Sequence, residues 1–403
     1  PLWSRGLGDV YKRQLLILQA REPLPNEIIT GVHGFVEKDR FDCKTDTCTF
    51  KLSQTSPDGV KVSFWADSSY GDSSPVFEAL VKVTKDPDIT RLVDRWQVDV
   101  LSTQWDGPEI ASCAAVWQTF RPSEGVPAWL KTPKNAKGLE SDIPYDYLAT
   151  RLIKAGGVDV SSCDNNGFNS DGSLNGCGSE ASRDAVFDWQ NRFDRIILSV
   201  AKDKQVPAQL LKNLFSRESQ FWPGIMQNGP DKGLGQITED GADTALLWNP
   251  AFYNAYCPLV LDANICKASG YANLQKYQQN LLQGALVASV DARCDTCPLG
   301  IDLDKAEKSI GIFAHTILAN CEQAGKLVEN ITGDPPAANL DYESMWKLTL
   351  VNYNAGSGCL GDAITNAYDP SANPALTWDR IRSNLDVFCP LAGSYVDDVT
   401  NNP

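Results

Sequence analysis

One carboxylate in this sequence has neighbours that would change its chemistry. Glu218 follows three apolar residues of the segment 207–220, at intervals of three, four and seven positions: Phe215, Leu214 and Leu211. A helix places residues at these intervals on one face, so the segment predicts a helix with Glu218 on its buried side. Burial penalises a charged carboxylate and raises its pKa. A carboxylic acid that keeps its proton near neutral pH can serve as a general acid.

A purely structural role is the alternative for Glu218. A carboxylate at a helix end can pair with a cation, and Arg217 and Lys212 are the candidates. Such an ion pair would explain the carboxylate without any role in ligand binding or catalysis. The choice between the two roles depends on residues elsewhere in the chain.

Two further segments place polar side chains among small residues. Residues 233–236 read Gly-Leu-Gly-Gln, and residues 353–356 read Tyr-Asn-Ala-Gly at the end of a helical run that begins near residue 342. Glycines let the backbone approach a bulky ligand closely, as in the wall of a groove, although a helix-capping loop would look the same. The spacing differs from that of phosphate-binding loops. Both segments indicate a site rather than a core.

Taken in order, the three segments Arg217-Glu-Ser219, Gly233-Leu-Gly-Gln236 and Tyr353-Asn-Ala-Gly356 resemble the catalytic domain of soluble lytic transglycosylases, which are related to goose-type lysozymes. The resemblance covers residues 185–390. It implies a mainly α, lysozyme-like domain in which Glu218 is the catalytic acid and base and Tyr353 hydrogen-bonds to it. It assigns substrate binding to Ser219, Gln236, Gly233, Gly235, Asn354 and Gly356.

The chain departs from the family pattern in three places. The family usually has Met where this chain has Gly235, and Ala where it has Asn352 before the tyrosine. Residues 251–298 form a cysteine-bearing insertion. The departures concern the substrate groove more than the fold.

The resemblance implies cleavage of the β-1,4 bond between N-acetylmuramic acid and N-acetylglucosamine in peptidoglycan. Glu218 would protonate the glycosidic oxygen and then take a proton from the C6 hydroxyl of the sugar, giving a 1,6-anhydro product. The nucleophile belongs to the substrate, so this reaction does not need the second carboxylate that ordinary glycosidases use. It implies no cofactor and no metal.

Two other functions remain open. A lysozyme-type hydrolase would need an acid near the glycine-rich turn to hold a water molecule, and Asp231, Glu239 and Asp240 are the candidates, although we interpret them as solvated turn residues. A non-catalytic wall-binding or adhesive protein would use the N-terminal part instead. The intact Glu218, Gln236 and Tyr353 argue against that function.

The composition excludes several partners. The 403 residues carry 51 acidic and 36 basic side chains, a formal net charge of −15, which argues against nucleic acid and anionic lipid. Hydrophobic residues make up 42%, enough for a globular chain. No apolar run reaches the ~20 residues of a membrane span. The oligomeric state stays open.

The twelve cysteines are typical of an exported protein. Eight of them lie in close pairs: Cys43 and Cys48, Cys163 and Cys177, Cys257 and Cys266, Cys294 and Cys297. Zinc is the alternative, because the last pair is a CxxC, but the sequence has only two histidines and no second ligand pair. We expect the cysteines to be oxidised, with Cys163 bonded to Cys177, and the protein to be extracellular, periplasmic or attached to the cell wall.

The N-terminal part reads as β-structure. Residues 48–52 and 60–66 alternate between apolar and polar side chains around a Pro-Asp-Gly turn and predict a hairpin, and residues 77–83 predict a further strand. We interpret Trp96, Trp105 and Trp117 as core residues, with a carbohydrate platform as the alternative.

We therefore expect a multidomain chain with a small β-sandwich-like module before the lysozyme-like domain. Residues 1–14 resemble a translated sequencing adaptor, so the natural chain is expected to extend upstream and to carry a signal peptide there. The expected parts are a β-rich, Ig-like module at 27–120, a linker with a disulfide loop at 121–182, the catalytic domain at 183–392 and a tail at 393–403.

Overall fold

The chain folds into two compact units. The computed structural model describes residues 15–20, 22, 27–86, 95–103, 112–117, 119, 122, 125–224, 231–372 and 374–401. The first unit comprises Pro1–Ile110 and Gln118–Val126, and the second comprises Ala111–Trp117 and Pro127–Pro403. A β-rich part thus precedes a mainly helical part, as the sequence predicts, while the expected adaptor at 1–14 lies outside the described residues.

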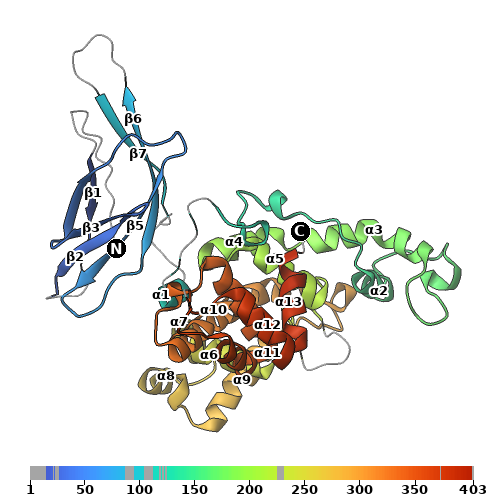
Figure 1. Ribbon diagram of the computed structural model, residues 1–403. Helices are drawn as coiled ribbons and strands as arrows, with labels where there is room; N and C mark the ends of the chain where they lie inside the picture. Colours follow the sequence, from blue (N-terminus) through green and yellow to red (C-terminus); the bar gives the residue numbers. More distant parts are fainter. Residues whose placement is uncertain are drawn as a thin grey trace. The chain divides into compact units, whose positions relative to one another are not determined.

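The described part of the first unit consists of antiparallel strands in two sheets (Figure 1). The strands are β1 (Leu15–Gln19), β2 (Ile29–Val36), β3 (Asp39–Cys43), β4 (Thr47–Lys51), β5 (Val60–Ser68), β6 (Phe77–Asp86) and β7 (Arg95–Thr103). One sheet has the order β3-β2-β5-β6-β7, and the other pairs β1 with β4. The strands predicted from the sequence correspond to β4, β5 and β6, and β1, β2, β3 and β7 were not individually predicted.

Side chains of both sheets share the apolar core of this unit. Leu18 and Cys48, from the two-stranded sheet, cluster with Val32 and Ala66 from the five-stranded sheet. A second cluster joins Leu52, just after β4, to valines of β5 and β6. The two sheets therefore pack face to face.

The predicted hairpin between residues 48–52 and 60–66 is wrong in its pairing. Both segments are strands, but β4 pairs with β1, whereas β5 pairs with β2 and β6. The turn before β5 does form, with Gly59 at φ 85° and its N–H bonded to the Ser56 carbonyl. Alternation identifies which face of a strand is buried but not its hydrogen-bonding partner, and here the chain crosses from one sheet to the other.

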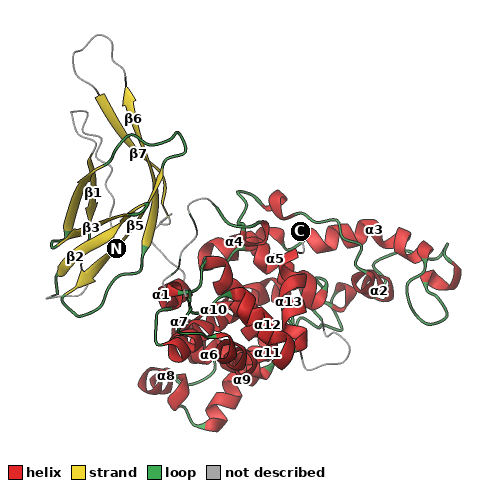
Figure 2. Cartoon of the chain, viewed as in Figure 1, coloured by secondary structure: helices red, strands yellow, loops and turns green. Residues whose placement is uncertain are grey.

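The described part of the second unit is mainly helical (Figure 2). Its helices are α1 (Ser112–Trp117), α2 (Asp146–Lys154), α3 (Gly176–Asn191), α4 (Asp194–Lys204), α5 (Ala208–Ser219), α6 (Glu239–Trp248), α7 (Pro250–Tyr256), α8 (Ala263–Ser269), α9 (Lys276–Val290), α10 (Leu303–Thr332), α11 (Tyr342–Ala367), α12 (Trp378–Phe388) and α13 (Pro390–Asn401). Among these helices and the other described segments, no helix is both long and apolar enough to cross a membrane.

Three expected boundaries differ in the structure. Residues 112–117, expected in the β-module, form α1 of the helical unit, where Trp117 is fully buried as a core residue. Most of the expected linker also belongs to the helical unit, because α2 packs against α3. Residues 393–401 of the expected tail belong to α13, which packs against α5 and α11. The side chain of Trp96 and all of Trp105 lie outside the described residues.

Ten of the twelve cysteines are paired. The bridges are Cys43–Cys48, Cys163–Cys177, Cys257–Cys266, Cys294–Cys297 and Cys359–Cys389. The predicted Cys163–Cys177 bridge is therefore confirmed. Cys113 and Cys321 are buried thiols in the structure. The cysteine-bearing insertion packs with α6 in an apolar cluster that includes Tyr253, Cys257 and Leu282.

Candidate active site

Helix α5 positions Glu218 as the sequence predicts. The helix spans Ala208–Ser219, and Leu211, Leu214 and Phe215 on its inner face are fully buried. It ends where Gln220 adopts a left-handed conformation with φ 47°. Glu218 lies in the last turn and is half-buried.

No cation pairs with Glu218 among the described residues. Arg217 instead pairs with Asp398, with 3.0 Å between Nε and Oδ2. Lys212 is buried and pairs with Asp194 at 2.5 Å between Nζ and Oδ1. Both cations of the structural alternative are thus engaged elsewhere, and Glu218 is not explained as half of a helix-end ion pair.

The partner of Glu218 is a tyrosine of the C-terminal helix. The Tyr395 hydroxyl of α13 donates a hydrogen bond to Oε1 of Glu218. Tyr395 is almost fully buried, and the guanidinium of Arg217 lies over its ring at 5.6 Å from the centroid. The carboxyl group therefore has a neutral hydrogen-bond donor as its partner.

The surroundings raise the pKa of Glu218 to about 7. Desolvation by burial is the main cause, and the nearby charge of Asp231 adds to it. The hydrogen bond from Tyr395 and the charge of Arg217 lower the pKa but do not compensate. A carboxyl group with this pKa holds its proton in a large fraction of molecules at neutral pH, as a general acid requires.

Ser219 joins the end of α5 to the glycine-rich turn. Its Oγ donates to the carbonyl of Leu234 at 2.8 Å and to that of Phe215 at 3.2 Å. The residue is fully buried, and in the structure its hydroxyl ties the turn to α5. That Ser219 helps to bind the glycan stays a prediction.

The glycines of the turn are required by close packing. Gly233 has φ 74°, and a Cβ there would lie 2.9 Å from the Val290 carbonyl oxygen. A Cβ at Gly235 would lie 2.0 Å from the ring of Phe313 in α10. The aromatic ring of Phe313 thus occupies the space that a side chain at position 235 would need, which explains the glycine at a position where the family that the motif resembles usually has Met.

The side chain of Gln236 closes the same turn. Its Nε2 donates to the carbonyl of Gly233 at 2.6 Å and to that of Gly224 at 3.3 Å. The backbone of Gln236 is left-handed, with φ 52°, and the residue is buried. The amide group that we expected to line a groove therefore stabilises the wall of the site.

Tyr353 lies beside the turn but does not bond to Glu218. Its hydroxyl donates to the carbonyl of Gly235, and its ring packs edge-on against Phe313 at 5.5 Å between centroids. Burial and the charges of Glu218 and Asp231 raise the pKa of Tyr353. Tyr353 therefore lies at the site, as predicted. The hydrogen bond to Glu218 that we expected from Tyr353 is donated by Tyr395 instead.

Asn354 and Gly356 follow Tyr353 on the outer side of α11. Asn354 is exposed, and Gly356 interrupts the helix with φ 80° and ψ 167°. The helical run therefore kinks at Gly356 and continues to Ala367 instead of ending there. The residue before the tyrosine, Asn352, is buried and donates to Asn320 of α10 at 2.8 Å.

Sequence reasoning missed Tyr395 because residues 393–403 were interpreted as a tail. A signal for it exists, because the buried residues of α13 recur at three- and four-residue intervals: Ala392, Tyr395, Val396 and Val399. This pattern predicts an amphipathic helix with the tyrosine on its buried face.

The three acids proposed for a hydrolase differ in position. Asp231 is half-buried, and its charge acts on both Glu218 and Tyr353. Glu239 and Asp240 are exposed in the first turn of α6, where carboxylates favour the helix N-terminus. Asp231 is therefore the one of the three that belongs to the site.

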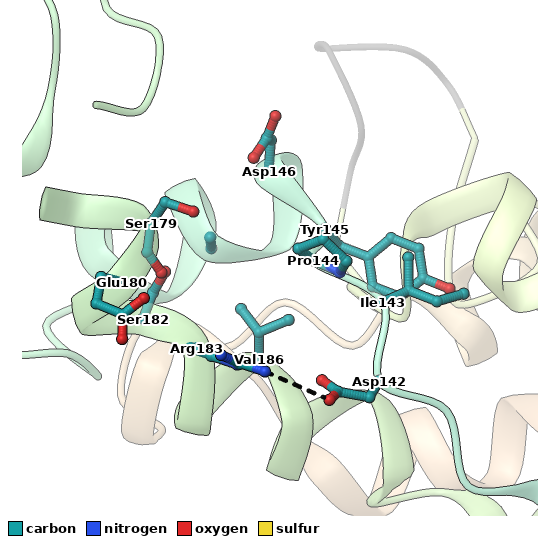
Figure 3. Close-up of a pocket in the computed structure, with 11 residues that line it drawn as sticks. Asp142, Ile143, Pro144, Tyr145, Asp146, Ser179, Glu180, Ser182, Arg183 and Val186 are labelled. Atoms are coloured by element: carbon teal, nitrogen blue, oxygen red, sulfur yellow. Dashed lines mark hydrogen bonds and ion pairs between the residues drawn. The ribbon is translucent and has the colours of Figure 1, made fainter. Parts of the chain in front are cut away.

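A separate hollow lies between the start of α2 and α3 (Figure 3). Its volume is about 260 Å³, and an ion pair between Arg183 and Asp142 at 3.8 Å lies at its edge. Tyr145 lines the hollow and hydrogen-bonds through its hydroxyl to Ser216 of α5 at 2.6 Å. None of the predicted site residues lines it.

Comparison with known protein families, with curated proteins and with solved structures finds no match to this chain. Function is therefore inferred from the motifs and from the geometry around Glu218. Within the described residues, no group of three or more His, Cys, Asp or Glu side chains could hold a metal ion.

Proposed function

We propose that this protein is a peptidoglycan lytic transglycosylase with Glu218 as its acid and base. One observation carries the proposal: a half-buried carboxyl group with a pKa of about 7, hydrogen-bonded to a tyrosine and paired with no described cation. The three motifs that resemble this family in sequence also meet in space, since Ser219 bonds to the turn and Tyr353 bonds to Gly235.

The proposed reaction uses one protein carboxyl group twice. The protonated Glu218 donates its proton to the glycosidic oxygen as the bond to the N-acetylmuramic acid ring breaks. The resulting carboxylate then accepts a proton from the C6 hydroxyl, whose oxygen closes the 1,6-anhydro ring. The Tyr395 hydroxyl stabilises the carboxylate between the two steps by donating to it.

A muramidase that uses water is the second candidate, and Asp231 favours it. Its charge reaches Glu218, so a carboxylate is available near the acid. In an inverting hydrolase, such a second carboxylate activates water on the opposite face of the sugar. The transglycosylase remains the first proposal because the motifs resemble that family and the reaction needs no second acid.

Digestion of purified peptidoglycan in H₂¹⁸O separates the two reactions. A transglycosylase releases unlabelled muropeptides with anhydro ends, lighter by one water than the hydrolytic products. A hydrolase releases reducing ends that carry ¹⁸O, and Asp231→Asn then abolishes the activity. Glu218→Gln is the control for a contaminating enzyme, and the absence of any Glu218-dependent product would overturn both candidates.

The proposed substrate also sets a location. Peptidoglycan lies outside the cytoplasmic membrane, and the five disulfides are compatible with an extracellular protein. We propose that the protein acts in the periplasm, at the cell wall or outside the cell, on glycan strands.

A further inference from the structure

The two cysteines without a bridge face each other inside the helical unit. Cys113 lies in α1 and Cys321 in α10, and these helices pack together. Both residues are fully buried. The side chain of Cys113 is a hydrogen-bonding neighbour of the Cys321 thiol. The two thiols are therefore neighbours in the packed contact between α1 and α10.

The packing of α1 against α10 holds this arrangement in place. The Trp117 indole N–H of α1 donates to the carbonyl of Cys321 at 2.8 Å, and Trp117 is fully buried. A Cβ at Gly325, one turn further along α10, would lie 2.8 Å from Val116 and 2.9 Å from Trp117. Side chains of α1 thus pack directly on the backbone of α10 one turn from Cys321.

We infer that Cys113 and Cys321 are a site of oxidative modification and form a sixth disulfide that fastens α1 to α10. The close, solvent-excluded contact of the two thiols supports the bond, and the ten other cysteines are already paired. Two free thiols that only fill space would be the alternative, because buried Cys also acts as a small apolar residue.

The bond forms by thiol–disulfide exchange with a disulfide oxidant of the export compartment. The thiolate of one cysteine attacks the oxidant, releases one oxidant sulfur as a thiol and forms a mixed disulfide. The second thiolate then displaces the other oxidant sulfur. Two electrons and two protons pass from the protein thiols to the oxidant, which leaves as two thiols.

The order of folding follows from the burial of the pair. In the folded state both thiols are shielded from solvent and so from an oxidant, and burial also raises the pKa of Cys321. Exchange therefore takes place before α1 has packed against α10. Once formed, the bond fixes α1, whose sequence is flanked on both sides by segments of the first unit.

Peptide mapping of the exported protein tests this inference. The full chain is denatured with iodoacetamide and without a reductant, digested and analysed by mass spectrometry. We expect a cross-linked peptide pair that contains Cys113 and Cys321, and neither residue alkylated. Alkylation of both residues in most molecules would overturn the inference.

Two variants make the test independent of the wild-type map. Cys113→Ala should expose one alkylatable thiol, at Cys321, where the wild type shows none. Cys163→Ala/Cys177→Ala removes a bridge elsewhere in the same unit and is the matched control, which should keep the Cys113–Cys321 peptide. An unchanged degree of alkylation at Cys321 in Cys113→Ala would contradict the bond.

Discussion

The Tyr395 hydroxyl donates a hydrogen bond to the Glu218 carboxyl group across a sequence separation of 177 residues. Glu218 lies in the last turn of α5, and Tyr395 lies in the middle of α13. Because this hydrogen bond favours the ionised form, it lowers the pKa of a group that burial raises. The pKa of Glu218 is thus set mainly by two opposing effects, burial that raises it and the hydrogen bond from Tyr395 that lowers it, with smaller effects from the charges of Arg217 and Asp231.

Glu218→Gln should abolish cleavage and leave the fold intact. The amide keeps the shape of the side chain and can still accept the Tyr395 hydrogen bond, but it has no proton to donate. General acid catalysis contributes roughly 10²–10⁴-fold to the rate. Turbidity clearance of cell-wall suspensions measures the loss, and circular dichroism checks the fold. Clearance at the wild-type rate would exclude Glu218 as the acid.

Glu218 should also make stability depend on pH. Its pKa is raised in the folded protein, so the folded state binds the proton more tightly than the unfolded state does. The resulting stabilisation is present at low pH and is lost as pH rises from about 4.5 to about 7. Above this range, the ionised carboxylate costs about 1–3 kcal/mol.

Thermal unfolding of Glu218→Gln beside the wild type measures this cost. The glutamine variant should be the more stable protein at pH 8, and its advantage should shrink at pH 5. An advantage that does not change between these two pH values would show that Glu218 has an ordinary pKa.

Tyr395→Phe should shift the pH profile of the reaction. Loss of the hydrogen bond removes an effect that lowers the pKa of Glu218, so the alkaline limb of the rate profile should move to higher pH. The maximal rate should fall, because the carboxylate formed during the reaction loses its donor.

Tyr353→Phe is the matched control for this shift. It removes a hydroxyl from the same site, but that hydroxyl bonds to the Gly235 carbonyl and not to the carboxyl group. It should change the rate without moving the alkaline limb. Equal shifts in the two variants would mean that Tyr395 does not act through Glu218.

Gly235→Ala should destabilise the helical unit. The new methyl group would lie 2.0 Å from a ring carbon of Phe313, and overpacking of this kind costs about 1–3 kcal/mol. Gly311→Ala in α10 is the control, since no atom lies within 4 Å of its added Cβ. Alanine there should stabilise the helix by roughly 0.5–1 kcal/mol. Chemical denaturation measures the free energy of unfolding of both variants, which should fall for Gly235→Ala and rise for Gly311→Ala.

Local patterns were sufficient to predict some of these features and not others. The apolar intervals before Glu218 predicted α5 to within one residue at either end. This was possible because the spacing of apolar residues within one segment is enough to identify a helix and its buried face. The partner Tyr395 could not be deduced in this way, since its contact depends on how α13 packs against α5. The pairing of β4 with β1 was missed for the same reason: alternation shows the buried face of a strand and not its neighbour.

The substrate-binding assignments show a second limit. Ser219 and Gln236 have the polar side chains that a groove needs, and sequence cannot tell whether such a group meets a ligand or a backbone carbonyl. In the structure, both donate to carbonyls of the protein. In the structure, the two side chains thus fix the backbone of the glycine-rich turn. The residue types alone do not reveal this role.

The buried ion pair between Lys212 and Asp194 has a consequence for the conditions in which the site works. Lys212 lies on α5, and its ammonium also donates to the Gln190 carbonyl at 2.7 Å. Dissolved ions screen the interaction between exposed charges strongly, but they screen a buried ion pair much less. The contacts that Lys212 makes to fix α5, the helix that contains Glu218, should therefore depend little on ionic strength.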